Sequence, residues 1–409
     1  MKWVNSIIPF KIVSAIFSPL IVLLTISLGG GASEVSFVFS SLTFGSLLGS
    51  LIWGNISFRT AHRRRIFILG FFGLTLSTFL LLFVKEIILI IFIAFIFSFL
   101  TTATLFAALA MIAHRYKKIT KAIGNFEKVG GWAWVVGLII GFFITSFLSA
   151  REILVFLFLI SLISLFYVFY VFKRKFLEKF AEDMMKDFGL LTWVEKGIEI
   201  ASRQERKLMR ILTAFPHVTR SAFPLISIII PKFPRRHFLL HFTFFLLFLS
   251  FGLAFSQQIT LIKEKGFTDN IVFLVSLISS IMAAIFYSKV YTVENLKDVL
   301  TKMFGIRIFM FILLTISVSL SDLPFLFISI IFSLLDGFSW AYIVILSNSM
   351  MIKISRTEVG INNFFRSIGY IVGSFISGVL VNEFGFATNF FLAVVLSSLS
   401  LFSFISVKI

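Results

Sequence analysis

The chain has no cysteine and few charged residues. Of its 409 residues none is Cys, and only 14% are Asp, Glu, Lys or Arg, against about 25% in a typical soluble domain. Without cysteine the chain can form no disulfide and offers no thiol nucleophile or cysteine-ligated metal. With 59% hydrophobic residues, it cannot cover a water-exposed surface with polar groups. The composition therefore predicts a protein that is largely surrounded by lipid.

Sequence signatures of catalysis are also lacking. The chain contains no nucleophile elbow, P-loop, HExxH motif or paired-carboxylate site, and its 5 histidines are scattered. We therefore expect neither an enzyme nor ATP-driven transport by this chain alone, and no metal or other cofactor. A membrane-embedded enzyme or assembly factor stays open as an alternative. It predicts a cluster of catalytic groups at one membrane interface.

Apolar runs of about 20 residues recur along the chain, and each is long enough to cross the roughly 30 Å hydrocarbon core as a helix. They predict twelve transmembrane helices, six before a polar gap and six after it. The first six lie near residues 7–28, 35–56, 66–84, 87–113, 127–150 and 153–172, and the second six near 238–262, 270–288, 303–321, 323–351, 360–382 and 384–407. The expected class is an all-α integral membrane protein.

The net charge of +18 comes from Lys and Arg that gather in alternate loops. Basic loops occur near residues 59–65, 115–121, 173–237, 289–302 and 353–356, whereas the intervening loops hold few basic residues, mostly beside an acid. Basic residues favour the cytoplasmic side of a membrane. The alternation therefore predicts a multi-pass protein of the cytoplasmic membrane with both termini in the cytoplasm. It also explains the charge without a nucleic-acid partner, which we do not expect.

The long basic segment divides the chain. We predict an N-terminal six-helix bundle over residues 1–174, a cytoplasmic linker over 175–236 and a C-terminal six-helix bundle over 237–409. The early part of the linker alternates charged and apolar residues. This pattern fits amphipathic helices on the inner leaflet, and it equally fits a solvated connector.

Two segments indicate an internal repeat. Residues 125–132 and 363–370 share the pattern Asn-Phe-x-basic-x-x-Gly-aromatic at an offset of 238. A spacing of small residues matches instead at an offset of 236, which places Gly124, Gly137 and Gly141 opposite Gly360, Gly373 and Ser377, with Gly369 opposite Ala133. Both registers stay open. Small residues spaced by four serve close helix packing or a moving helix interface.

The loop between the second and third predicted helices carries a family motif. Gly54, Ile56, Ser57, Arg59 and Arg63 match the pattern Gly-x-aliphatic-small-Asp-Arg-x-Gly-Arg-basic. On this loop, and on two six-helix halves joined by a basic segment, the chain resembles the major facilitator superfamily over essentially its whole length. The resemblance implies two pseudo-symmetric bundles, alternating access, and conformational roles for Gly54, Arg59 and Arg63 and for the glycines of the repeat. Phe58 replaces the family's acid, which puts that acid's contact across the halves in doubt.

Ionisable side chains inside predicted membrane helices mark candidate sites, because each costs about 2.5–3.5 kcal/mol at the bilayer centre. Asp336 lies near the middle of an uncharged run. It can exchange a proton as the site opens to each side, or it can be a structural acid bonded to a neighbouring helix. Arg366, about 10 Å inside its helix, is expected to approach Asp336 or to snorkel to the interface. Lys11 has the same two interpretations, a cavity role or snorkelling.

Several other residues complete the candidate site. We expect contacts with solute or a coupled proton from Gln257, Gln258, Trp340, Asn363 and Tyr370. Trp132 and Trp134 fall on different faces of the fifth predicted helix, where aromatic residues more often pack against lipid or helices. Four further residues are expected near helix ends: Arg307 and His241 at the interface, and Glu127 with Lys128 as an end-of-helix pair.

Together these features predict a secondary transporter. We expect a monomer, embedded in lipid, that moves a small organic solute with proton coupling through Asp336, and with Arg366 as the electrostatic partner of that acid. Few charges and 57 Phe residues favour an apolar or amphipathic solute, and hence efflux. An uptake permease for a sugar or organic acid remains the alternative.

Overall fold

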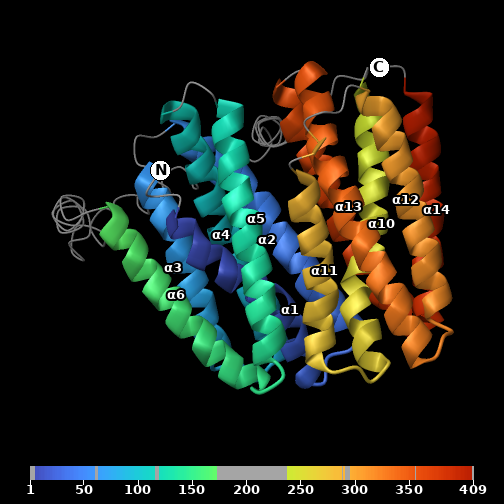
Figure 1. The fold of residues 1–409 in the computed structure, drawn as a ribbon, viewed down its shortest axis with the longest axis horizontal. Coiled ribbons are helices and arrows are strands. Elements are labelled where there is room, and N and C mark those ends of the chain that lie inside the picture. Colours follow the sequence, from blue (N-terminus) through green and yellow to red (C-terminus); the bar gives the residue numbers. More distant parts are fainter. Residues whose placement is uncertain are drawn as a thin grey trace, which may run out of the picture. The chain divides into compact units, whose positions relative to one another are not determined.

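The structure, a computed structural model, describes residues 5–59, 63–115, 119–172, 237–287, 289–290, 295–354 and 356–407. These residues are helical almost throughout (Figure 1). The helices are α1 (Ile7–Ser27), α2 (Ala32–Arg59), α3 (Arg63–Leu81), α4 (Ile87–Arg115), α5 (Ile119–Ile144), α6 (Ala150–Phe172), α10 (Phe238–Glu264), α11 (Asp269–Tyr287), α12 (Leu296–Ser317), α13 (Asp322–Ile354) and α14 (Arg356–Ser406). Within the described residues, 11 helices are long and apolar enough to cross a membrane. The predicted linker, 175–236, lies outside the described residues.

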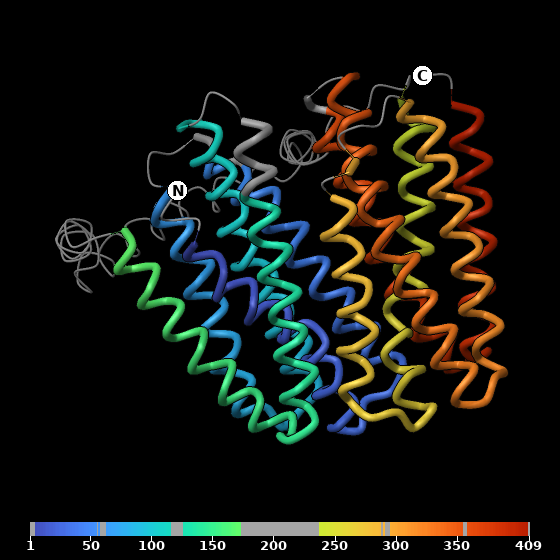
Figure 2. The backbone as a smooth tube through the Cα atoms, viewed as in Figure 1, coloured from blue at the N-terminus to red at the C-terminus, as the bar shows by residue number. Residues whose placement is uncertain are grey.

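Helix α14 is broken in its middle. Among its 51 residues, Gly385 has φ 78° and ψ 170°, a conformation that glycine adopts without steric cost because it has no Cβ. Before the break, Ser377 Oγ donates to the backbone O of Leu253 (2.9 Å), and after it Asn389 Nδ2 donates to the same oxygen (2.8 Å). The chain therefore turns back along α10 at Gly385 (Figure 2). The two arms of α14 correspond to the helices predicted near 360–382 and 384–407.

Two helices begin earlier than the apolar runs predict. Helix α12 starts at Leu296, where Asn295 caps it by accepting from the Asp298 N–H at 3.2 Å, and not near residue 303. Helix α5 starts at Ile119 and not near residue 127. Each extra stretch is about two turns long and contains charged residues, so hydropathy alone does not reveal it. The consequence is that Arg307 and Glu127 lie inside helices and not at their ends.

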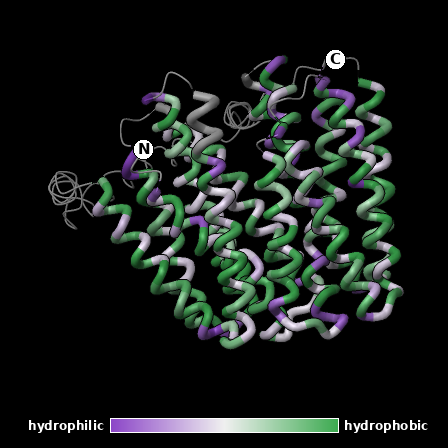
Figure 3. Tube along the Cα trace, viewed as in Figure 1, coloured by the Kyte–Doolittle hydropathy of each residue, from purple (hydrophilic) through white to green (hydrophobic). Residues whose placement is uncertain are grey.

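The outer faces of the helices carry large apolar side chains. Phe92, Phe166 and Phe402 are 60%, 64% and 68% exposed, and Figure 3 shows hydrophobic residues along the helix bodies, with hydrophilic segments mainly near the helix ends. Exposed apolar surface of this extent requires a lipid environment, because soluble proteins rarely expose large contiguous apolar patches. The chain is a multi-pass membrane protein.

Glycines allow close contact between helices in both parts of the chain. Gly137 of α5 lies against α1, where an added Cβ would come within 2.6 Å of the Ile12 backbone O. Gly373 of α14 lies in the same way against the Leu249 backbone O of α10. Gly137 and Gly373 are partners in the 236-residue register, so the two parts of the chain repeat this packing.

Candidate functional site

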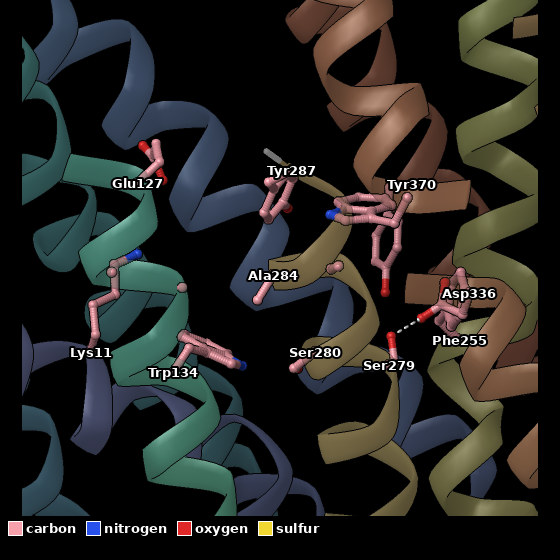
Figure 4. Close-up of a pocket in the computed structure, with 14 residues that line it drawn as sticks. Lys11, Glu127, Trp134, Phe255, Ser279, Ser280, Ala284, Tyr287, Asp336 and Tyr370 are labelled. Atoms are coloured by element: carbon pink, nitrogen blue, oxygen red, sulfur yellow. Dashed lines mark hydrogen bonds between the residues drawn. The ribbon is translucent and has the colours of Figure 1, made fainter. Parts of the chain in front are cut away.

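A cavity of about 420 Å³ lies between helices α1 and α5 on one side and helices α10, α11, α13 and α14 on the other. Its volume is within the range of roughly 300–1,000 Å³ that is typical of small-molecule sites. It is lined by Lys11, Glu127, Gly130, Gly131, Trp134, Phe255, Ser279, Ser280, Ala283, Ala284, Tyr287, Asp336, Trp340 and Tyr370 (Figure 4). Four residues that the sequence predicted, Lys11, Asp336, Trp340 and Tyr370, are among them.

Asp336 is held by an arginine and a serine from two neighbouring helices. Arg307 Nη1 of α12 donates to Asp336 Oδ1 at 2.6 Å, and Ser279 Oγ of α11 donates to Oδ2 at 2.5 Å. Arg307 Nη2 also donates to the Asp336 backbone O at 3.1 Å. The Arg307 side chain is 0% exposed and the Asp336 side chain is 18% exposed toward the cavity. The carboxylate therefore joins three helices and still reaches the cavity.

This pair corrects two predictions. We expected Arg366 as the partner of Asp336 and Arg307 at the membrane interface, and both expectations are wrong. Because α12 begins at Leu296, Arg307 is eleven residues from its start, or about 16 Å. This depth brings Arg307 level with Asp336, where the rings of Phe251 and Phe255 lie 4.6 and 5.6 Å from its guanidinium carbon.

Arg366 is buried and forms no ion pair with a described acid. It is 8% exposed, and its Nη1 makes only long contacts, each 3.4 Å, with Ser347 Oγ, Asn348 Oδ1 and Asn363 Oδ1. Its guanidinium carbon lies 4.2 Å from the centre of the Phe248 ring. Among the described residues it has no ion-pair partner, and neither Arg366 nor Asn363 lines the cavity. Arg366 thus brings an uncompensated positive charge into the region behind the cavity wall.

The opposite wall carries Lys11, Glu127 and Trp134. Lys11 Nζ lies 5.8 Å from the centre of the Trp134 ring, and an added Cβ at Gly130 would be 3.4 Å from Lys11 Cε. Figure 4 shows these three side chains on one side and Asp336 on the other. The end-of-helix interpretation of Glu127 is wrong because α5 starts eight residues earlier. Trp132, by contrast, is 46% exposed and lies outside the cavity.

Gln257 and Gln258, predicted to contact solute, do not line the cavity. Gln257 is 0% exposed, and its Nε2 donates to the Ala32 backbone O (3.0 Å) and to Ser36 Oγ (2.7 Å) of α2. Three further bonds join α2 to α14: Ser40 Oγ donates to the Ile371 backbone O (3.4 Å) and lies 2.8 Å from Ser374 Oγ, and Asn382 Nδ2 donates to Ser33 Oγ at 2.8 Å. We name Ser33, Ser36 and Ser40, which share one side of α2, the serine face.

The serine face is one of the places where helices before the linker contact helices after it. It lies at the start of α2, near the loop at residues 28–31, and on the other flank Gly141 of α5 packs against the Phe273 ring of α11. The contacts of the serine face and the contact of Gly141 with Phe273 both lie near the helix ends that are farthest from the two termini (Figure 1). The cavity residues of α5 and α11 lie in the helix halves nearer the termini. The N-terminal and C-terminal helices therefore touch on the side of the cavity away from the termini.

The remaining predicted residues serve packing in this structure. An added Cβ at Gly54 would meet the Phe106 ring at 3.4 Å, and Gly369 lies against the Phe245 backbone of α10. Arg63 Nε donates to the Ser57 backbone O at 3.1 Å. Gly124 lies within α5, but its surroundings, like the Arg59 side chain, are outside what the structure describes. His241 lies in the first turn of α10, close to the helix end as predicted. It is 1% exposed, and its Nε2 lies 2.5 Å from Glu358 Oε2.

Comparisons with known proteins agree with this geometry. The sequence matches the family model of the Major Facilitator Superfamily over residues 8–360, and no curated protein matches it significantly. Similar solved structures include a mutant of the nucleoside transporter NupG (TM-score 0.69, 13% identity, 100% of this chain and 98% of that chain). A second is a structure of proton dependent oligopeptide transporters (TM-score 0.66, 13% identity, 99% of this chain and 95% of that chain). A third is a D-xylose-proton symporter (TM-score 0.65, 12% identity, 100% of this chain and 96% of that chain). At these identities the structural likeness shows the fold, and the family match shows that the chain belongs to the major facilitator superfamily of membrane transporters.

Proposed function

We propose that this chain moves a small organic solute across the cytoplasmic membrane by alternating access, with proton coupling through Asp336. The observation that carries the proposal is a cavity walled by helices from both parts of the chain, with Lys11 on one wall and Asp336 on the other. Charged side chains inside membrane helices are costly, so Lys11 and Asp336 need a function that offsets the cost. Contact with a solute or a proton between two moving halves is such a function. One copy of the chain supplies every wall of the cavity, so we propose the monomer as the transporting unit.

The proposed architecture has twelve membrane spans. Counting the two arms of α14 separately, six helices precede the linker at 175–236 and six follow it, in halves 1–174 and 237–409. The repeated packing of Gly137 on α1 and Gly373 on α10 supports matched halves. Two halves that meet around a midplane site are the usual basis of rocking transport.

The conformation is proposed to be inward-facing. The alternation of basic loops predicts cytoplasmic termini, and the serine face lies near the helix ends that are farthest from the termini. With the termini in the cytoplasm, the serine face closes the cavity to the outside. Rocking of the halves must break its hydrogen bonds with Gln257, Ser374 and Asn382 and close the opposite end.

Proton coupling is proposed to act through the Asp336 pair. A proton on Asp336 cancels the carboxylate charge and leaves Arg307, which is 0% exposed, without a counter-ion. An unpaired buried charge costs several kcal/mol, so the proton favours a different arrangement of α11, α12 and α13. Proton binding can therefore be tied to a change of conformation. Asp336 has both a structural and a coupling role in this proposal.

Efflux is the proposed direction. Phe255, Trp134 and Trp340 give the cavity an aromatic lining, which suits apolar or amphipathic solutes more than highly hydrated ones. Uptake of a sugar or organic acid is the competing direction. Cells that express the chain should hold less of a lipophilic dye than cells with an empty vector, and they should gain no labelled sugar. A rise in either content would contradict efflux.

The coupling proposal has a sharper test. In proteoliposomes, Asp336→Asn with Arg307→Gln keeps a neutral hydrogen-bonding pair and removes the proton site. This double variant should exchange dye across the membrane at a rate near that of the wild type, but should not concentrate it when a pH gradient is imposed. Trp132→Phe, outside the cavity, is the control for expression and folding. Gradient-driven accumulation by the double variant would contradict coupling through Asp336.

A further inference from the structure

We infer that the solute is an organic monoanion with an apolar body, whose carboxylate binds Lys11. The inference rests on the proposed transport function and adds a chemical class to the same cavity. It follows from the charges on and behind the cavity wall and from the aromatic rings beside them.

Lys11 is an ammonium group that reaches the cavity and forms no ion pair with a described acid, Glu127 of the same wall included. It is half-buried on α1, lines the cavity, and among the described residues it has no ion-pair partner. Its stem packs beside Gly130, and its Nζ lies 5.8 Å from the centre of the Trp134 ring. The stem is therefore supported while the ammonium donors remain free for a ligand. Figure 4 shows Lys11 in the wall that faces Asp336.

The negative charges near the cavity are already compensated or screened. Each Asp336 carboxylate oxygen accepts a hydrogen bond, one from Arg307 at 2.6 Å and one from Ser279 at 2.5 Å, so the pair is neutral as a unit. Glu127 is exposed, where water and salt weaken its field. Arg366 is 8% exposed and has no acid partner among the described residues. Asp336, Arg307 and Arg366 together thus carry one net positive charge, which favours an anion over a cation.

The rest of the cavity matches an apolar body. Trp134 faces it from one wall, and Phe255, Trp340 and Tyr370 face it from the other. Aromatic rings bury large apolar area and stack on flat ligands. A volume of about 420 Å³ holds one ring or a short chain with its carboxylate. A monoanion of this kind uses Lys11 for its charge and the rings for its body.

The test uses the purified full-length chain in lipid nanodiscs and four ligands with one skeleton. Phenylacetate carries a negative charge, phenylacetamide none, phenethylamine a positive charge, and phenylalanine both. Binding is read from quenching of tryptophan fluorescence and from the shift in thermal unfolding. Phenylacetate should bind roughly tenfold to a hundredfold more tightly than phenylacetamide, because it adds a charged hydrogen bond. Phenethylamine should bind most weakly.

Three variants test whether the preference for the anion depends on Lys11. Lys11→Met should bind phenylacetate and phenylacetamide equally, and Lys11→Arg should keep the preference for the anion. Lys128→Met removes an exposed lysine of α5 that does not line the cavity, and it should leave the preference unchanged. Unchanged anion binding by Lys11→Met, tighter binding of phenethylamine or phenylalanine, or no binding by any of the four ligands would overturn the inference. The dye exchange assay with Asp336→Asn and Arg307→Gln tests the transport function separately, so each can fail alone.

Discussion

Asp336 and Arg307 form a pair in which the two side chains differ in access to water. Arg307 is 0% exposed and Asp336 is 18% exposed. Loss of the Asp336 carboxylate therefore leaves the fully buried Arg307 without its counter-ion. Loss of Arg307 leaves Asp336 with its access to the cavity and its hydrogen bond from Ser279. The two single substitutions should have unequal effects.

Asp336→Asn should lower the free energy of unfolding by about 3–5 kcal/mol, the cost of breaking a buried ion pair. Arg307→Met should cost less, and the double variant less than the sum of the two singles. Thermal unfolding in detergent measures all three. Ser279→Ala, which removes one hydrogen bond to the carboxylate, should cost about 1 kcal/mol and serves as the reference. An equal loss of unfolding free energy in Asp336→Asn and Arg307→Met would show that the difference in burial of the two side chains does not matter for stability.

At the scale of helices, glycine contacts fix how closely two elements approach. Gly373 touches the Leu249 backbone of α10, whereas Gly131 has no atom within 4 Å of an added Cβ. Backbone atoms cannot move aside as a flexible side chain does. Substitution should therefore be costly at the first glycine and tolerated at the second.

Gly373→Ala should destabilise the protein by about 1–3 kcal/mol, as overpacking of a close contact does. Gly131→Ala should be neutral or slightly stabilising, since alanine favours helix over glycine by about 1 kcal/mol. Thermal unfolding of the two variants, prepared side by side, makes the comparison. A stable Gly373→Ala variant would mean that α10 and α14 can separate slightly without loss.

The serine face gives a second prediction at this scale. Gln257→Leu removes both hydrogen bonds to α2 and leaves Ser36 without its partner. It should shift the population toward a conformation open to the outside. Because the chain has no native cysteine, Ser280→Cys on the cavity wall can serve as the only thiol. A membrane-impermeant maleimide added outside should label it faster when Gln257→Leu is present.

The control for this experiment is Ser41→Ala. Ser41 Oγ donates to the Ile91 backbone O of α4, so the bond joins two helices before the linker and does not cross to the C-terminal helices. External labelling should stay at the reference rate with Ser41→Ala. If both substitutions speed labelling equally, the serine face has no special part in closing the outer side.

At the scale of the whole molecule, the orientation in the membrane can be measured in the same cysteine-free background. Gly31→Cys lies in the loop before α2 and His114→Cys near the end of α4, and both residues are exposed. Impermeant reagent should label the first in intact cells and the second only after permeabilisation. The reverse pattern would place the termini outside and make the observed conformation outward-facing.

Hydropathy predicted most helices because a chain segment in lipid must satisfy its own backbone hydrogen bonds, which a helix does. An apolar run long enough to cross the membrane is therefore helical. It placed the starts of α5 and α12 about two turns late, since those turns contain charged residues. This error hid Glu127 and Arg307. Lys11, Asp336, Trp340 and Tyr370 were found because charged or amphipathic side chains are conspicuous inside apolar runs. Trp134 carries no such signal, since exposed Trp132 looks the same in sequence.

The sequence by itself determined the membrane class, the helical make-up and the position of Asp336 inside a long apolar helix, because the cost of polar groups in lipid acts on each segment alone. Only the tertiary structure decided that Arg307 pairs with Asp336, that Arg366 pairs with no acid in the described part of the chain, and that Gln257 joins helices and does not face the cavity. These outcomes depend on how helices rotate and pack against one another. Residues far apart in the chain share that packing, and no local pattern records it.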